Sequence, residues 1–250
     1  MKYGKAKILF LDIETAPNLV ANWGCGYKLT VGPDSIVQER YIISAQWSWN
    51  NDKTVHGILG NIKKADDRNV IKKLTRELSK ADAIVGHNIK KFDARWIEGR
   101  AMINGLPPTG AALMPTFDTM SLAKKVFYLN SYKLDYIAKK LGIGQKVKTE
   151  YNDWMKVLVN KDLNRAKFLL EYGKHDVSLN RKVFEKLLPY VRLPMLLGTL
   201  ISGKKHVCSC GSTNLSSKGT RIARRSGIVY QRRVCNDCGS CDQIPKKEGE

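Results

Sequence analysis

The sequence predicts a mixed α/β domain with a central sheet, followed by a small cysteine-rich module. Strand-like segments come first along the chain and then alternate with helix-like segments, which is the order of a sheet covered by helices. Five of the six cysteines lie in the last fifth of the 250 residues. Hydrophobic residues make up 43% of the chain, enough for a packed core, so a globally disordered protein is excluded. We place the domain at 1–197 and the module at 198–250.

Apolar runs bounded by polar residues predict the strands. Residues 7–14 (KILFLDIE) suit a strand that is buried on both faces. Residues 41–50 and 53–59 are rich in β-branched and aromatic residues and lie close together, as paired strands do. Residues 82–88 (DAIVGHN) predict another short buried strand.

Helical periodicity predicts the elements that alternate with these strands. In residues 66–81 the apolar side chains Val70, Ile71, Leu74 and Leu78 share one helical face. Residues 92–105 predict a helix that ends at a glycine. Further helices are expected at residues 119–127, 131–143 and 164–191.

The charge balance predicts a polyanionic partner. Lysine and arginine exceed aspartate and glutamate by 43 − 23 = +20, at an isoelectric point near 9.7, and nucleic acid is the expected ligand. No run of 18 apolar residues exists, and the N-terminal apolar run is soon interrupted by charge, so neither a membrane partner nor a signal peptide is expected. A cytoplasmic protein is predicted, whose cysteines serve as thiols or metal ligands rather than disulfides.

Two carboxylates stand at the end of the first predicted strand. Asp12 and Glu14 project from one face of it, and Ile13 from the other. Adjacent acids in an apolar strand repel each other and resist desolvation, and a divalent cation between them relieves both problems. The alternative is a pair of surface carboxylates, because Asp-x-Glu is short enough to arise by chance.

Two further motifs carry acids. Asp93 ends His87-Asn-Ile-Lys-Lys-Phe-Asp93 after the strand at 82–88, where an ordinary first-turn helix acid is the alternative. Tyr172 and Asp176 lie four apart on one face of the last long helix, where a core tyrosine above a solvated aspartate is the alternative. Asp-x-Glu and Tyr-x3-Asp each occur once, and the order of the motifs allows them to converge at one sheet edge.

In this order, LDIET, HNIKKFD and YGKHD resemble the three motifs of the DnaQ-like 3′–5′ exonucleases of the ribonuclease H-like superfamily. The likeness covers residues 7–190 and is to the four-acid branch with a tyrosine, as in the proofreading domains of family B DNA polymerases. The histidine branch would place histidine where Glu171 stands. The resemblance implies a ribonuclease H-like mixed sheet flanked by helices.

The resemblance also implies an active site with two Mg²⁺ or Mn²⁺ ions. Asp12 would bridge both ions, Glu14 and Asp176 would complete the first site, and Asp93 would serve the second. Tyr172 would orient the attacking water, since a phenol with a pKa of about 10 is a poor base at neutral pH.

The same resemblance places Asn88 and Phe92 beside the terminal nucleotide, with a core position as the equal alternative for Phe92. Asp118 is interpreted as a helix cap rather than a fifth ligand. The expected activity is a metal-dependent 3′–5′ exonuclease on single-stranded DNA, with a separate polymerase or repair protein as a partner. The alternatives are an exoribonuclease of the same chemistry and a catalytically silent nucleic-acid-binding protein.

The C-terminal cysteines have the spacing of a zinc site. Cys208-x-Cys210 and Cys235-x2-Cys238 are separated by 24 residues, with the hairpin-like text GIVYQRRV between them. Four thiolates around one Zn²⁺ would stabilise a segment too small for its own core, as in a zinc ribbon. The usual first knuckle is Cys-x2-Cys, and Val207 stands at its leading position, so Cys208 or His206 completes the set. Cys241 could compete with Cys238, and chance clustering of free cysteines is the remaining alternative.

Arginines surround these cysteines. Residues 198–250 hold ten Lys/Arg and four Asp/Glu, a net charge of +6. Guanidinium groups bind phosphate well, although a solvated surface is the alternative. The expected nucleic-acid contacts here are Arg224, Arg225, Arg232 and Arg233.

Overall fold

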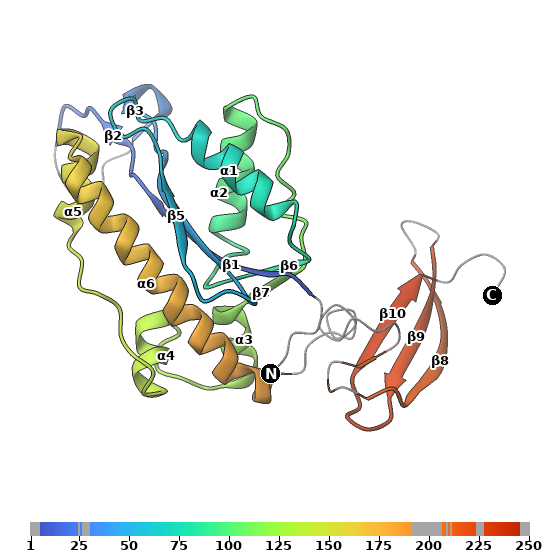
Figure 1. Ribbon diagram of the computed structural model, residues 1–250. Helices are drawn as coiled ribbons and strands as arrows, with labels where there is room; N and C mark the ends of the chain where they lie inside the picture. Colours follow the sequence, from blue (N-terminus) through green and yellow to red (C-terminus); the bar gives the residue numbers. More distant parts are fainter. Residues whose placement is uncertain are drawn as a thin grey trace. The chain divides into compact units, whose positions relative to one another are not determined.

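A computed structural model of the chain describes residues 6–24, 26, 31–191, 207, 208, 210, 212–223 and 228–245, without the side chains of Asp242 and Pro245 (Figure 1). The chain divides into two compact units, Lys7–Lys186 and a second one made of Met1–Ala6 with Leu187–Glu250. The predicted domain boundary, between residues 197 and 198, lies outside the described residues. Among the helices described, none has the length and apolar character needed to cross a membrane.

Five strands form the sheet of the larger unit, in the order β5-β4-β1-β6-β7. β4 is antiparallel to both β5 and β1, whereas β1, β6 and β7 run parallel, so the predicted mixed sheet is confirmed. The strands are β1 (Ile8–Thr15), β4 (Ile42–Trp49), β5 (His56–Leu59), β6 (Ala83–Gly86) and β7 (Thr116–Asp118). Two short strands, β2 (Leu19–Val20) and β3 (Ile36–Gln38), pair with each other in a separate sheet.

Helices cover both faces of this sheet. α1 and α2 lie against one face, and the long α6 crosses the other (Figure 1). The helices are α1 (Arg68–Leu78), α2 (Asp93–Ile103), α3 (Thr119–Val126), α4 (Leu134–Lys140), α5 (Tyr151–Asn160) and α6 (Leu163–Leu187), with short 3-10 helices at Pro33–Ser35 and Leu188–Tyr190. The apolar face predicted for α1 is buried in the core beneath it.

Besides the short strands β2 and β3, the sequence analysis did not predict β7 and α5. β7 has only three residues, too few for a period of two to be recognised. α5 follows a polar segment, and its start is marked only by a capping box in which the side chains of Glu150 and Asp153 bind each other's backbone N–H groups.

The alternation along β1 decides which face carries the acids. Leu9, Leu11 and Ile13 belong to the core beneath α1 and α2. Phe10 points the other way, where its ring meets Phe184 of α6 at a centroid distance of 5.8 Å. Because Asp12 and Glu14 share the parity of Phe10, they lie on the α6 face of the sheet, and the predicted pairing of the two acids on one face holds.

The smaller unit contains a three-stranded antiparallel sheet in the order β10-β9-β8. Its strands are β8 (Leu215–Ile222), β9 (Val229–Cys235) and β10 (Cys241–Pro245). The predicted hairpin corresponds to β8 and β9, and β10 adds a third strand.

α6 approaches the sheet very closely at Gly173. A Cβ atom at this position would lie 2.5 Å from both Cδ and Oε1 of Gln46, which is fully buried on β4 opposite Asp12. A larger residue therefore requires either the Gln46 side chain or the helix to move. The glycine therefore sets the depth at which its neighbour Tyr172, and Asp176 one turn later, lie over β1.

We predict that Gly173→Ala destabilises the protein by about 1–3 kcal/mol, because overpacking against Gln46 outweighs the better helix propensity of alanine. Chemical denaturation measures this. Gly99→Ala in α2 is the matched control, since open space surrounds that glycine. It should be neutral or stabilising by up to about 1 kcal/mol. Equal effects of the two variants would contradict the close approach.

Candidate active site

Three carboxylates from two elements meet over the sheet. Asp12 and Glu14 of β1 and Asp176 of α6 each offer an oxygen, and these oxygens lie within 4.8 Å of one another. Burial raises the pKa of Asp12 well above its usual value, and the neighbouring carboxylates raise it further. Burial followed by the charge of Asp176 raises the pKa of Glu14 to about 8. The cluster is therefore costly to ionise without a cation.

The donor set fits a divalent metal ion. Asp176 is only 2% exposed, and its Oδ1 atom has no hydrogen-bond partner among the described residues. Burial also raises the pKa of this carboxyl. Carboxylate oxygens are the ligands that Mg²⁺ and Mn²⁺ prefer, and a bound cation would remove both the repulsion and the unsatisfied acceptor.

Asp93 lies beside this cluster rather than inside it. It is the first residue of α2, it is buried, and its Oδ1 accepts a hydrogen bond of 3.1 Å from the backbone N–H of Ile13. This hydrogen bond places Asp93 against the residue that follows Asp12, and the charge of Asp93 adds to the burial that raises the pKa of Asp12. Burial raises the pKa of Asp93 itself to about 7. Three of the four predicted acids thus share one cluster, and the fourth adjoins Asp12.

Tyr172 is joined to this cluster by a lysine that the sequence analysis missed. The Nζ atom of Lys146 lies 2.5 Å from Oδ2 of Asp176 and donates a hydrogen bond of 3.0 Å to the Tyr172 hydroxyl. Burial lowers the pKa of Lys146, but Asp176 and Tyr172 together more than offset this and raise it overall. Burial, and then Asp176, raises the pKa of Tyr172 to about 12. The lysine stays charged and the phenol stays protonated at neutral pH.

Lys146 comes from the segment between α4 and α5. Its backbone N–H donates a 2.8 Å hydrogen bond to Asp135 Oδ1, which fixes the segment. The segment is polar and also contains Lys148, so no pattern in the sequence singles out Lys146.

Trp154 of α5 is a second residue that the sequence analysis missed. Its ring meets Tyr172 edge to face at a centroid distance of 6.4 Å. A hydrogen bond from its side chain opposes the rise in the pKa of Glu14. The capping box at Glu150 and Asp153 was the available signal, because it would have placed Trp154 on a helix.

Asp118 holds the motif HNIKKFD (residues 87–93) in place through hydrogen bonds. It caps α3 by accepting from Ser121 N–H, as predicted, and it also accepts from the backbone N–H groups of Asn88 at 3.0 Å and Lys90 at 3.4 Å. Asn88 has a φ of +65°, a left-handed conformation that asparagine tolerates. Phe92 is 39% exposed, so its ring is accessible rather than part of the core.

The structure also brings together the four cysteines predicted to bind zinc. The Sγ atoms of Cys208 and Cys238 are 3.4 Å apart, those of Cys210 and Cys235 are 3.7 Å apart, and all four lie within 4.8 Å of one another. A tetrahedral zinc site with Zn–S bonds of about 2.3 Å requires sulfur separations of roughly 3.8 Å. Cys241 is exposed and outside this group, and His206 lies outside the described residues.

The predicted arginine contacts are only partly available. Arg232 on β9 is exposed. Arg233 on the same strand is 9% exposed, and its predicted contact with phosphate stays a prediction. Arg224 and Arg225 lie outside the described residues.

Comparison with known proteins assigns the larger unit to a protein superfamily. The family model of the RNase H superfamily matches residues 39–188, and the chain belongs to this superfamily. The match includes Asp93, Tyr172 and Asp176 and begins after Asp12 and Glu14. No curated protein sequence matches the chain significantly.

Solved structures support the fold. One that matches is the family B DNA polymerase from the hyperthermophilic archaeon Pyrobaculum calidifontis, with a TM-score of 0.57 and 18% identity. The match covers 78% of this chain and 25% of that polymerase. This likeness shows the fold of the larger unit.

We predict that Asp12→Asn raises the melting temperature of the metal-free protein at pH 8, because it removes one of the mutually repelling charges. A relief of about 1 kcal/mol corresponds to about 2–4 °C for a chain of this size. Adding Mn²⁺ should raise the melting temperature of the wild type but not that of the variant.

Asp34→Asn, at an exposed position in the 3-10 helix Pro33–Ser35, is the control and should respond to Mn²⁺ as the wild type does. A wild-type shift with Mn²⁺ in the Asp12 variant would exclude Asp12 as a ligand.

We predict one equivalent of zinc per chain, lost in Cys235→Ser and retained in Cys241→Ser, because only the first cysteine belongs to the sulfur cluster. Elemental analysis of the purified proteins measures this. Zinc loss in the Cys241 variant would show that the ligand set is different.

Proposed function

We propose that this chain is a metal-dependent 3′–5′ exonuclease of the DnaQ-like, tyrosine-containing type, carrying a zinc ribbon that binds nucleic acid. The observation that carries this proposal is the cluster of Asp12, Glu14 and Asp176 with Tyr172 and Lys146 attached to it, in a fold of the RNase H superfamily. A catalytically silent protein would have no reason to keep one buried and two half-buried carboxylates so close together.

The carboxylates are the proposed metal ligands. Asp12, Glu14 and Asp176 would hold one divalent ion, and Asp93, with Asp12 shared, would hold a second. When bound, such a pair supplies an activated water and neutralises charge on the phosphate during hydrolysis. Asp93 is held to β1 by the Ile13 N–H group, so its carboxylate keeps its place beside Asp12.

Tyr172 and Lys146 would act on the water and the phosphate. With a pKa of about 12, Tyr172 cannot remove a proton at neutral pH, so its hydroxyl orients the attacking water by hydrogen bonding. The Lys146 ammonium holds that hydroxyl and adds positive charge beside the scissile phosphate. Trp154 packs against the Tyr172 ring and limits its movement.

The proposed direction and substrate rest on the motif type. The tyrosine in YGKHD and the likeness to a family B DNA polymerase support removal of nucleotides from the 3′ end of single-stranded DNA. The same site chemistry would act on RNA, because the named residues address phosphate and metal rather than sugar. A polymerase or repair protein is the proposed partner.

The module at residues 198–250 is proposed to add affinity. Four thiolates close a tetrahedral zinc site and leave no position for water, so the zinc is structural. Exposed basic residues such as Arg221 and Arg232 would contact the phosphate backbone.

We predict that the protein with Mg²⁺ or Mn²⁺ releases a 3′ label as mononucleotide at the earliest times, while a 5′-labelled strand shortens to a ladder. Tyr172→Phe should slow cleavage about 10- to 100-fold and retain the Mn²⁺-induced rise in melting temperature, since only the orienting hydroxyl is lost.

Tyr151→Phe is the control, because Tyr151 is exposed on α5 and should show the wild-type rate. Parallel digestions of single-stranded DNA, duplex DNA and RNA, each repeated with chelator, identify the substrate. Internal cuts, release of the 5′ label first, or full activity in chelator would overturn the proposal.

A further inference from the structure

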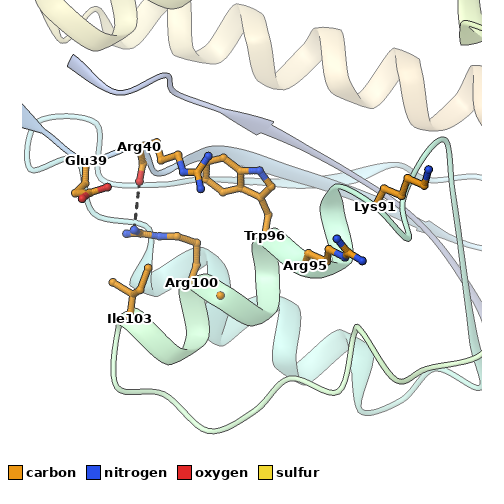
Figure 2. A pocket seen from close by; sticks show the side chains of 8 residues that line it. Glu39, Arg40, Lys91, Arg95, Trp96, Arg100 and Ile103 are labelled. Atoms are coloured by element: carbon orange, nitrogen blue, oxygen red, sulfur yellow. Dashed lines mark hydrogen bonds between the residues drawn. The ribbon is translucent and has the colours of Figure 1, made fainter. Parts of the chain in front are cut away.

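A pocket with a volume of about 330 Å³ lies along α2, outside the carboxylate cluster (Figure 2). Its lining comes from α2, from the turn before it and from the segment that leads into β4. The residues are Glu39, Arg40, Lys91, Arg95, Trp96, Gly99, Arg100 and Ile103.

The pocket is strongly basic. Arg40, Lys91 and Arg95 are exposed and form no ion pair with any carboxylate among the described residues. Arg100 differs, because its Nε and Nη2 atoms bind the buried Asp67 carboxylate at 2.7 and 3.0 Å. Glu39 is the one carboxylate in the lining, so at least two positive charges have no counterpart there.

An aromatic surface accompanies these charges. The Arg40 guanidinium lies 4.8 Å from the centroid of the Trp96 ring, and Figure 2 shows the two side chains stacked together. The Phe92 ring follows at a centroid distance of 5.9 Å from Trp96. Trp96 packs against the core and is thus held in place. Cationic and aromatic groups side by side are the combination that binds the phosphates and bases of a single strand.

The pocket and the acidic cluster both adjoin the end of β1, although α2 and the acids lie on opposite faces of the sheet. α2 begins at Asp93, and Arg95, Trp96 and Arg100 lie within its next two turns. Arg40 precedes β4, whose Ile42 pairs with Thr15, the residue after Glu14. From Asp93 to Arg100 the helix rises roughly 10 Å at about 1.5 Å per residue. Stacked nucleotides advance about 3.4 Å each along a strand, so this length accommodates about three of them.

We propose that this pocket binds the single-stranded nucleic-acid substrate on the 5′ side of the bond that is cut. Arg40, Lys91 and Arg95 bind the phosphates, and a base stacks on the Arg40–Trp96 pair or on Phe92. The strand polarity in this assignment rests on the proposed 3′–5′ exonuclease activity. The proposal that the pocket binds a single strand is independent of that activity, because it is argued from the basic and aromatic side chains alone.

The first test is fluorescence anisotropy of labelled dT12 in chelator, where cleavage is prevented. Arg40→Gln/Arg95→Gln should weaken binding about 10-fold. The slope of log affinity against log salt should become shallower by roughly 1.4, because each phosphate neutralised on a single strand contributes about 0.7. Lys72→Gln/Arg76→Gln on α1 is the charge-matched control, since both side chains are exposed and outside the pocket. It should change binding little.

A second variant tests the aromatic surface without removing charge. Trp96→Leu keeps an apolar side chain against the core, and melting curves verify folding. It should weaken dT12 binding about 5-fold or more, as expected when base stacking is removed. Free thymidine monophosphate and inorganic phosphate should compete only weakly with dT12, because the pocket gains its affinity from several nucleotides.

The third test separates the pocket from the reaction. The p-nitrophenyl ester of thymidine 5′-monophosphate reaches the carboxylate site alone, so the double arginine variant should hydrolyse it at the wild-type rate. On single strands of four or more nucleotides the same variant should show a raised KM and an unchanged kcat.

Several outcomes would overturn the assignment. Wild-type affinity for dT12 in the double variant, a weakening no larger than in the control, or competition by inorganic phosphate as strong as by dT12 would each do so. Failure of the proposed function looks different: the wild type would cleave neither substrate, while weaker dT12 binding in the pocket variants would still support a single-strand site.

Discussion

The site depends on the crowding of like charges between β1 and α6. Asp12, Glu14 and Asp176 stay within 4.8 Å although burial raises the pKa of all three and repulsion raises the pKa of Asp12 and Glu14 further. The fold holds them there through contacts that carry no charge, above all Gly173 on Gln46 and Phe184 on Phe10. The packing of α6 thus holds the carboxylates together against their mutual repulsion. A bound cation would attract all three and remove that repulsion.

Lys146 links the stability of the cluster to its chemistry. Its ammonium group neutralises part of the charge at Asp176 and also holds the Tyr172 hydroxyl. The Lys146 ammonium therefore both lowers the cost of ionising Asp176 and holds the Tyr172 hydroxyl, which is proposed to orient water. The acids are surrounded by groups that restrain them, Ile13 N–H for Asp93 and Trp154 for Glu14, so the geometry exists before substrate binds.

The two units solve the problem of buried ligands in opposite ways. The larger unit has a hydrophobic core against which the carboxylates of Asp12, Glu14 and Asp176 are held, and their oxygen atoms are suited to a divalent ion. The smaller sheet has few buried apolar residues, and its sulfur cluster of two buried and two more accessible cysteines is the centre around which β8, β9 and β10 are arranged. A closed site suits a structural role, and an open one suits hydrolysis.

Sequence periodicity by itself determined the strand with Asp12 and Glu14 on one face and the helix with Tyr172 and Asp176 one turn apart. The spacing of the cysteines likewise determined the two knuckles. All of these relations are local along the chain. The sequence placed Asp93 at the start of α2 and Asp118 as a cap for the same reason. Only the tertiary structure decided that Lys146 and Trp154 enter the site, that Arg233 is buried, and that Arg40 meets Trp96. Those contacts join residues far apart in sequence, and they depend on how closely helix and sheet pack, which no local period records.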